Sequence, residues 1–144
     1  MCPLEVADPL AHRALQALFR AETSMRRVLA ADLEREGVSA AGFSALVVLT
    51  TAGGSVELRT LRRRLDWSKA NATEVTITLE SRGLVVRRRL EHDRRSSALD
   101  LTPAGRALVD RLFPGHADRV TTAFASLDEE EKRSLAYICR KLTA

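Results

Sequence analysis

The side chains best suited to chemistry lie in the middle of the chain, and they are cations and hydrogen-bonding groups. Ser68, Lys69 and Asn71 lie close together, and the run HDRR follows at residues 92–95. Lysine and arginine neutralise phosphates, while asparagine can pair with the edge of an adenine base. These residue types therefore point to contact with a nucleic acid rather than to catalysis.

Two short helices and a hairpin must position these side chains. The spacing of leucines predicts a helix over 57–65, and Ser68 is the expected N-cap of a second helix that runs to about Arg82. Alternating side chains then predict strands over 84–90 and 97–101. One face of the first strand is expected to hold Leu84, Val86 and Leu90, and the other face is expected to hold Val85, Arg87 and Arg89. This order is the outline of a winged helix-turn-helix, whose second helix enters a groove of duplex DNA.

The positive charge of the chain is concentrated in the same segment. The formal net charge is +4, yet residues 56–106 hold 12 lysine and arginine residues against 7 acidic ones. The rest of the chain holds 11 basic against 12 acidic residues, so the whole basic excess lies in this segment. Localised positive charge is what phosphate binding requires. A solvated basic face would show the same composition, so charge alone leaves both interpretations open.

Helices with apolar stripes flank this unit. A long helix is predicted over 9–36 and a shorter one over 40–51. Thr102 and Pro103 begin another helix, which Pro114 is expected to kink or interrupt. A capping box of Asp128 and Glu131 begins the last helix. A long apolar helix at one end of a small domain often packs against something outside it.

Two motifs resemble those of the MarR family of bacterial transcription regulators. The first is LESRGLVVR at residues 79–87, which fits the family pattern of Leu-Glu, two residues, Gly-Leu-Val, one residue and Arg. The second is DRRSSALDLTPAG at residues 93–105, which fits Asp-x-Arg on the wing, followed by Leu-Thr and a nearby glycine. With the flanking helices, the resemblance covers essentially the whole chain.

The resemblance implies a mainly α-helical fold of the α+β class, with a winged helix-turn-helix that has a two-stranded wing. A single MarR-type domain would span 1–144, with about 1–36 and 103–144 as dimerisation helices and about 37–102 as the DNA-binding region. A two-fold homodimer would bind a pseudo-palindromic double-stranded operator with half-sites about one helical turn apart. Repression is the commoner mode in the family, so we expect a ligand-responsive repressor.

DNA contacts follow from the resemblance and from side-chain chemistry. Arg95 occupies the arginine of the wing motif and would enter the minor groove, while Asp93 would orient it or a neighbouring residue. Asn71 can pair with adenine, and Lys69 can reach guanine or a phosphate. Some hydroxyl groups have an alternative role in capping or bonding their own helix. The candidate DNA contacts are Arg62, Arg63, Ser68, Lys69, Asn71, Ala72, Thr73, Thr76, His92, Asp93, Arg94 and Arg95.

Many members of the family bind a small anionic aromatic effector between the dimerisation helices and the winged domain. The candidate wall residues are Arg13, Arg20, Met25, Phe43 and Leu46. An arginine could pair with the carboxylate of a ligand, although a solvated helix face is the commoner outcome for such residues. Other members sense peroxides through a cysteine near the first helix, for which Cys2 is the candidate. Cys139 is expected to serve as a small apolar residue of the last helix.

Enzymatic chemistry is not expected. The three histidines are scattered, and the sequence shows no Gly-x-Ser-x-Gly, no phosphate-binding glycine loop and no metal-ligand spacing, so we expect no cofactor and no metal. The sequence has no apolar run of about 20 residues and no secretory signal, which predicts a cytoplasmic protein without a membrane partner. Two alternatives stay open: a dimeric protein-interaction module of the same fold without operator binding, and a cysteine-based redox-sensing regulator.

Overall fold

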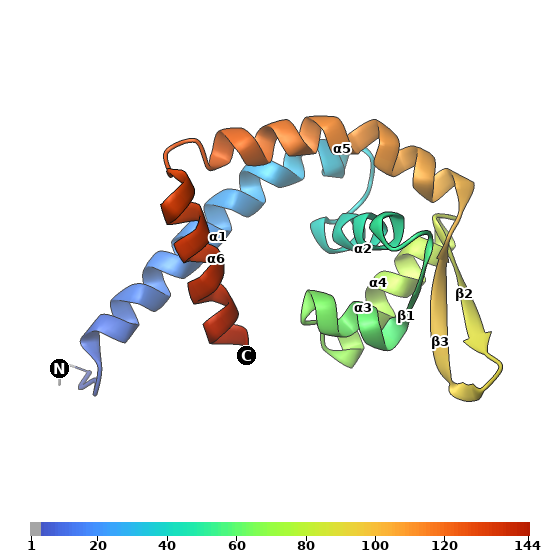
Figure 1. Ribbon diagram of the computed structural model, residues 1–144, viewed down its shortest axis with the longest axis horizontal. Helices are drawn as coiled ribbons and strands as arrows, with labels where there is room; N and C mark the ends of the chain where they lie inside the picture. Colours follow the sequence, from blue (N-terminus) through green and yellow to red (C-terminus); the bar gives the residue numbers. More distant parts are fainter. Residues whose placement is uncertain (1–3) are drawn as a thin grey trace.

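An arch of long helices carries a smaller unit made of short helices and a sheet (Figure 1). The computed structural model describes residues 4–144, apart from the side chain of Arg94. Along this part of the chain, the elements are α1 (Pro9–Arg35), α2 (Ala40–Thr51), β1 (Ser55–Glu57), α3 (Leu58–Leu65), α4 (Lys69–Ser81), β2 (Val85–Leu90), β3 (Asp93–Leu101), α5 (Pro103–Ala123) and α6 (Glu129–Thr143). The predicted fold class is confirmed.

Local sequence signals begin the helices where they were expected. Ser39, Ser68 and Thr102 each accept a hydrogen bond from the backbone N–H three residues further on, at 3.0–3.1 Å. Asp128 and Glu131 form the predicted capping box, in which each side chain accepts a hydrogen bond from the other residue's backbone N–H at 2.8 Å. One such cap typically stabilises a helix by about 1 kcal/mol.

The strands form an antiparallel sheet in the order β1-β3-β2. The hairpin of β2 and β3 is the predicted wing, and the short β1 adds a third strand because Val56 pairs with Leu99. Ser97, Ala98 and Leu99 are all at most 9% exposed, so the base of the hairpin is buried on both faces. The wing is therefore fixed to the body at its base.

The predicted alternation along β2 fails at Val85 and Val86, whereas Leu84 and Leu90 are both buried, as sharing one face requires. Val85 is 1% exposed, whereas Val86 is 52% exposed and lies on the solvent side. The alternation was counted from Leu84, which lies before the first residue of the strand. The register also shifts between Arg89 and Leu90, which brings Leu90 back to the buried side. A one-residue irregularity moves the side chains that follow to the opposite face of a sheet.

The central helix of the core is α2. Phe43, Leu46 and Leu49 are at most 2% exposed and belong to one cluster with Leu99 of β3. Phe43 also packs edge-on against the ring of His116 in α5, with centroids 5.0 Å apart. Burying one large apolar side chain contributes about 1.5–3 kcal/mol. Phe43 and Leu46 are thus core residues, and their role as walls of a ligand site stays a prediction.

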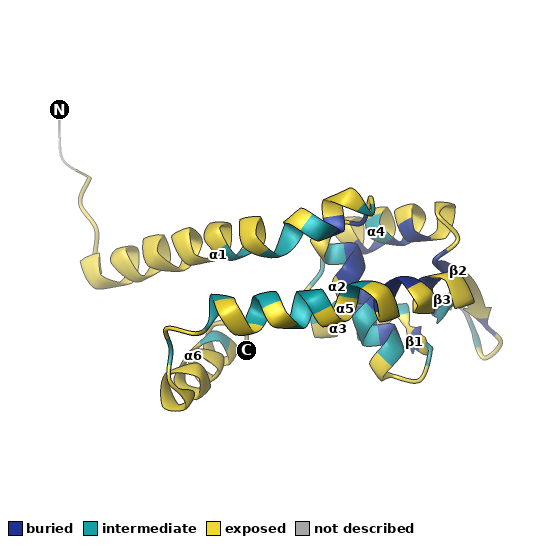
Figure 2. Cartoon of the chain, turned by 90° about the horizontal axis from the view of Figure 1, so that it is seen from above, coloured by how far each residue is buried: buried dark blue, intermediate teal, exposed yellow. Residues whose placement is uncertain are grey.

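The helix α5 forms the top of the arch, where it packs on α1 and α2 (Figures 1 and 2). It is continuous through Pro114, so the predicted interruption is wrong. A proline inside a helix removes one backbone hydrogen bond and crowds the preceding turn. The packing of α5 against α1 and α2 offsets the free energy lost with this hydrogen bond.

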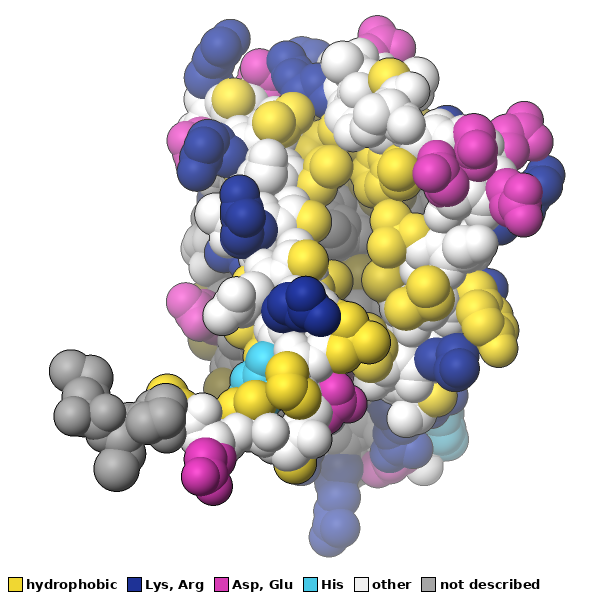
Figure 3. Space-filling model, turned by 90° about the vertical axis from the view of Figure 1, so that its left-hand side faces the viewer, with side chains coloured by type: hydrophobic (Ala, Val, Ile, Leu, Met, Phe, Trp, Pro, Cys, Tyr) yellow, Lys and Arg dark blue, Asp and Glu magenta, His cyan; other side chains and the backbone are white. Residues whose placement is uncertain are grey.

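Both α1 and α6 expose large apolar side chains. These residues are Leu10, Leu15, Leu18, Phe19 and Val28 on α1, and Leu135, Tyr137, Ile138 and Leu142 on α6, each at least 39% exposed. Figure 3 shows hydrophobic atoms gathered along both sides of the groove between these helices. None of the helices within residues 4–144 is long and apolar enough to cross a lipid bilayer. So large an apolar patch is typical of a surface that a partner covers.

Gly105 of α5 leaves no room for a side chain. A Cβ added there would lie 2.2 Å from the carbonyl oxygen of Leu84, whereas a Cβ at Gly115 would meet nothing closer than 3.8 Å. We expect Gly105→Ala to lower the free energy of unfolding by about 1–3 kcal/mol or more, because the backbone must move. Gly115→Ala, the matched control in the same helix, should raise it by about 0.5–1 kcal/mol. Urea unfolding at one fixed protein concentration measures both changes, and equal effects would contradict the packing argument.

Candidate DNA-binding surface

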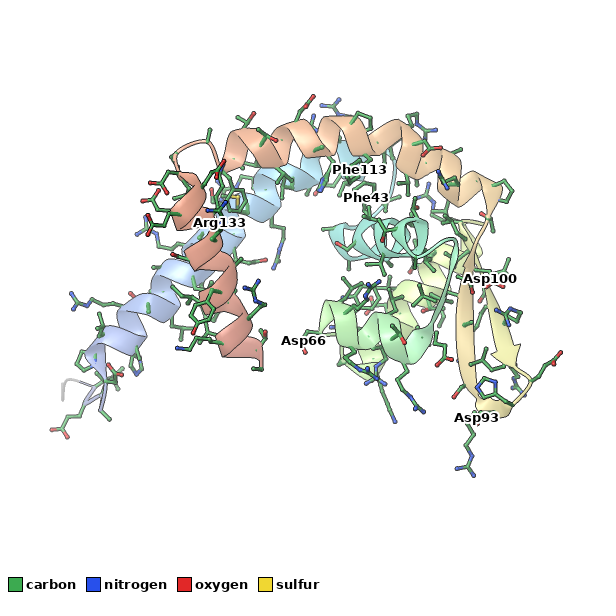
Figure 4. All side chains as sticks on the ribbon, in the orientation of Figure 1. Phe43, Asp66, Asp93, Asp100, Phe113 and Arg133 are labelled. Atoms are coloured by element: carbon green, nitrogen blue, oxygen red, sulfur yellow. The ribbon has the colours of Figure 1, made fainter. Side chains whose placement is uncertain are left out.

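The helices α3 and α4 and the tip of the wing lie on the side of the molecule away from α5 (Figure 1). The turn between α3 and α4 is sharp because Asp66 adopts a left-handed conformation with φ of +52° (Figure 4). Ser68 then caps α4, so its hydroxyl serves the helix in this structure. The α3–turn–α4 unit followed by the β2–β3 hairpin is a winged helix-turn-helix.

One face of α4 is buried and the other is open. Ala72 and Thr76 are each 1% exposed, because they lie on the same helical stripe as the buried Leu79. The predicted contacts of Ala72 and Thr76 with DNA are therefore wrong. Lys69 and Asn71 remain exposed, as does the methyl-bearing side chain of Thr73, whose hydroxyl donates to the carbonyl oxygen of Lys69 at 2.9 Å.

Three further residues of α4 share the open face. Ala70, Glu74 and Ile77 line a shallow hollow of about 660 Å³ together with Lys69 and Thr73. Ile77 is 59% exposed, although it is a large apolar residue. The sequence held a signal for this face, because Ile77 lies off the apolar stripe that Ala72 and Leu79 define. The open face of α4 thus has cationic, hydroxyl, acidic and apolar groups for reading base edges.

Asp93 fixes the conformation of the wing tip (Figure 4). Its carboxylate accepts hydrogen bonds from the backbone N–H of Arg95 at 3.0 Å and from the hydroxyl of Ser96 at 2.8 Å. Both bonds favour the charged form, and they lower the pKa of Asp93 below its ordinary value. The side chains of His92 and Arg95 are exposed. Asp93 therefore orients the backbone that carries Arg95, rather than the guanidinium itself.

An ion pair stiffens the hairpin nearer its base. Nε of Arg88 donates to the carboxylate of Asp100 at 2.9 Å, and the hydroxyl of Ser55 donates to the same carboxylate at 2.6 Å. The bond from Arg88, followed by that from Ser55, lowers the pKa of Asp100. Arg88 is thereby neutralised, so it differs from the cations of the tip.

Beneath the wing, α3, the start of α4 and both hairpin strands enclose a cavity of about 390 Å³. It brings together three of the predicted DNA contacts, namely Arg62, Lys69 and Arg95. Arg63 is exposed on α3 and does not line this cavity. Arg59 and Arg87, which complete the basic lining, were not predicted, because the cavity forms only where four separate stretches of the chain meet.

The predicted effector residues do not form one site in this structure. Arg13 and Arg20 are exposed on α1, and the hollow of about 330 Å³ beside Arg20 contains none of the other predicted wall residues. Met25 is half-buried. A separate cavity of about 260 Å³ lies between α2 and α5, lined by Val47, Thr50, Thr51, Val109, Asp110, Phe113 and Pro114. Cys139 is partly exposed on α6, and Cys2 lies outside the described residues.

The sequence is similar to known transcriptional regulators. Residues 38–97 match the model of the MarR family. The chain is 32% identical over 110 residues to the uncharacterized HTH-type transcriptional regulator YkoM of Bacillus subtilis, covering 76% of this chain and 71% of YkoM. It is also 32% identical over 111 residues to the transcriptional repressor MprA of Escherichia coli, covering 76% of this chain and 63% of MprA.

The fold is shared with solved structures of the same kind. One is BpsR of Bordetella bronchiseptica, a protein whose DNA binding is regulated by 6-hydroxynicotinic acid. Its TM-score is 0.80 at 25% identity, and the match covers 99% of this chain and 98% of that chain. Another is Sco3205 of Streptomyces coelicolor, a MarR-family regulator solved in complex with DNA. Its TM-score is 0.85 at 23% identity, and the match covers 99% of this chain and 91% of that chain. The present chain belongs to the MarR family of transcriptional regulators.

The pKa of Asp93 should report the integrity of the wing tip. We expect its carboxyl group to titrate below the ordinary aspartate range, and Ser96→Ala to raise its pKa, because one bond to the charged form is lost. The conservative variant Ser96→Thr should keep the pKa low. Since the folded pKa is depressed, the stabilisation is present above the unfolded aspartate pKa and is lost as pH falls through the folded value. Carboxyl ¹³C NMR measures the titration, and an ordinary pKa in the unaltered protein would contradict the assignment.

Proposed function

We propose that the protein is a cytoplasmic, homodimeric, ligand-responsive repressor that binds a pseudo-palindromic DNA operator. The observation that carries this proposal is the placement of two surfaces in one chain. Exposed cations and the open face of α4 lie at one end, and the unpartnered apolar faces of α1 and α6 lie at the other. A DNA reader with two-fold symmetry needs both surfaces.

We assign recognition of the DNA sequence to the open face of α4 and to the wing. Lys69, Asn71 and Thr73 face solvent at the start of α4, where a recognition helix meets base edges in the major groove. Arg95 at the wing would enter the adjacent minor groove, whose negative potential attracts arginine. The backbone phosphates would be contacted by Arg62, Arg63, His92 and Arg94.

Dimerisation is assigned to the helical arch. A second copy of the chain would cover the apolar faces of α1 and α6, which are exposed in the single chain. The proposed regions are about 1–36 and 103–144 for dimerisation and about 37–102 for DNA binding. Burial of these faces contributes about 25 cal/mol for each Å² of apolar surface removed from water. Two-fold symmetry would then set the two α4 helices at a fixed spacing along the duplex.

The proposed effector is a small anionic aromatic, of the kind that regulates BpsR. Arg13 or Arg20 on α1 would pair with its carboxylate. Repression is the mode of the relative MprA. The relatives are transcriptional regulators, and we expect no catalytic activity. A redox-sensing regulator that uses Cys2 or Cys139 and an interaction module without operator binding are the rival functions.

Selection of bound duplexes from a random pool tests the proposal and supplies the operator. We expect a pseudo-palindromic site, and we expect Arg95→Ala to weaken its binding by about 1–3 kcal/mol, roughly fivefold to more than a hundredfold. The matched control is Arg106→Ala, because Arg106 is an exposed arginine of α5 that pairs with Asp110. This substitution should leave the affinity for the operator unchanged. Gel shifts at a stated salt concentration measure affinity, and size-exclusion chromatography checks the dimer. Failure to select any sequence would favour the interaction module.

Asn71→Ala should relax the base preference at one position in each half-site. The expected cost at that position is about 1–3 kcal/mol, because the bidentate pair with one base is lost. Measuring affinity for every single-base variant of the operator distinguishes the possibilities. A uniform loss across all sequences would move Asn71 from base reading to phosphate contact.

A further inference from the structure

The cavity beneath the wing has an unusually basic lining. Its charged residues are Arg59, Arg62, Lys69, Arg87, Arg95 and a single acid, Glu57. They come from β1, α3, the first residue of α4 and the two strands of the hairpin. Like charges gathered around one cavity repel one another unless an anion lies among them. The lining therefore favours occupation by an anionic group.

These cations are not neutralised within the chain. Among the ion pairs of residues 4–144, Arg88, Arg111 and Arg119 have acidic partners, whereas none of the five cations of the cavity has one. Arg62 differs from the other four in the burial of its Nε. Its Nε is buried and has no hydrogen-bond partner in the described structure. Because that nitrogen is closed to solvent, Arg62 can meet a ligand in the cavity only through the other atoms of its side chain.

Arg87 is held in position before any ligand arrives. Its Nε donates to the hydroxyl of the buried Ser97 at 3.1 Å, and its backbone N–H donates to the carboxylate of Glu80 at 3.2 Å. These bonds fix the side chain on the wall of the cavity while leaving the terminal nitrogens of its guanidinium available. A positioned guanidinium binds oxyanions well, because its planar N–H groups match two oxygens at once.

The cavity also lies where a DNA strand must pass. Lys69 at its edge begins the helix proposed to enter the major groove, and Arg95 at its other edge belongs to the wing proposed to enter the minor groove. The two grooves of a duplex are separated by one sugar–phosphate backbone. A strand bound in this way would cross the mouth of the cavity.

We propose that the cavity beneath the wing binds one phosphate group, held by Arg62 and Arg87 with Arg59, Lys69 and Arg95 around it. The phosphate comes from the operator backbone or from free inorganic phosphate, and the chemistry of recognition is the same. Where DNA is the source, the inference rests on the proposed function. A tetrahedral oxyanion supplies several acceptors at once, which the guanidinium groups around the cavity can share.

Inorganic phosphate is the probe of the first experiment. The arginine Nε–Hε NMR signals of the full-length protein are followed as sodium phosphate replaces sodium chloride at constant ionic strength. We expect a saturable shift of the Arg62 signal, and ³¹P line broadening with one site per chain. Arg62→Gln should weaken phosphate binding by about tenfold or more, because the charge-assisted bonds are lost. Arg64→Gln is the matched control, since Arg64 is exposed on the same helix and does not line the cavity.

The second experiment measures affinity for the selected operator across a range of salt concentrations. If a backbone phosphate occupies the cavity, Arg62→Gln weakens binding and lowers the slope of log affinity against log salt by about one for each half-site. Arg64→Gln changes both quantities less. Thermal melting checks that each variant is folded, and Arg59→Gln, at an exposed position of the lining, provides a second variant if Arg62→Gln is unstable.

Each outcome has one meaning. Loss of operator affinity in Arg62→Gln beyond that in Arg64→Gln supports a backbone phosphate in the cavity. A saturable phosphate response with unchanged operator binding supports free phosphate as the ligand. A phosphate response in a protein that binds no duplex would leave the cavity as a phosphate site and refute the proposed function. The inference is overturned if phosphate gives no saturable response and the two variants bind the operator equally.

Discussion

The close packing of α4 against α2 is the constraint on which the rest of the structure depends. Ala72, Thr76 and Leu79 bury one face of α4, and Gly42 allows the approach, because a Cβ there would lie 3.3 Å from Cδ2 of Leu79. Burial of Thr76 is unfavourable for its hydroxyl, which has no hydrogen-bond partner in the described structure. Leaving such a group unsatisfied typically costs about 1–3 kcal/mol of stability. With this face fixed in the core, the opposite face must point to solvent.

A second constraint is the distribution of charge pairs. Two arginines of the arch are neutralised within the chain, because Arg111 pairs with Glu36 and Arg119 pairs with Asp32. The cations beneath the wing have no such partners in the part of the chain that the structure describes. The positive potential therefore extends from one end of the molecule, although the formal net charge is only +4. Such a field attracts polyanions to the end where α4 and the wing are exposed.

The parts that sequence analysis predicted are those that local interactions determine. Helix boundaries followed from caps such as Ser68 and from apolar spacing, because both depend on residues within a few positions. Val85 and Val86 were assigned to the wrong faces of β2, because the strand begins one residue after Leu84 and the bulge at Leu90 is set by pairing with β3. Ala72 was predicted to touch DNA, and its burial depends on tertiary packing that the sequence does not show. The cavity beneath the wing was not predicted, because its lining comes from separate segments.

The same packing connects the arch to the DNA-reading helix. Nη1 of Arg82, just beyond the end of α4, donates to the carbonyl oxygen of Gly37 at 2.6 Å, in the turn that joins α1 to α2. On the other side of α2, Phe43 lies against His116 of α5, and burial lowers the pKa of that histidine so that it favours the neutral ring. Thus α4 is tied to α1 by a hydrogen bond and to α5 through the core. In the proposed dimer, the spacing of the two α4 helices is therefore set by how the arches pack. An effector that preferred one packing of the arches would change DNA affinity without touching α4, since a ligand shifts an equilibrium only by its differential affinity for the two states.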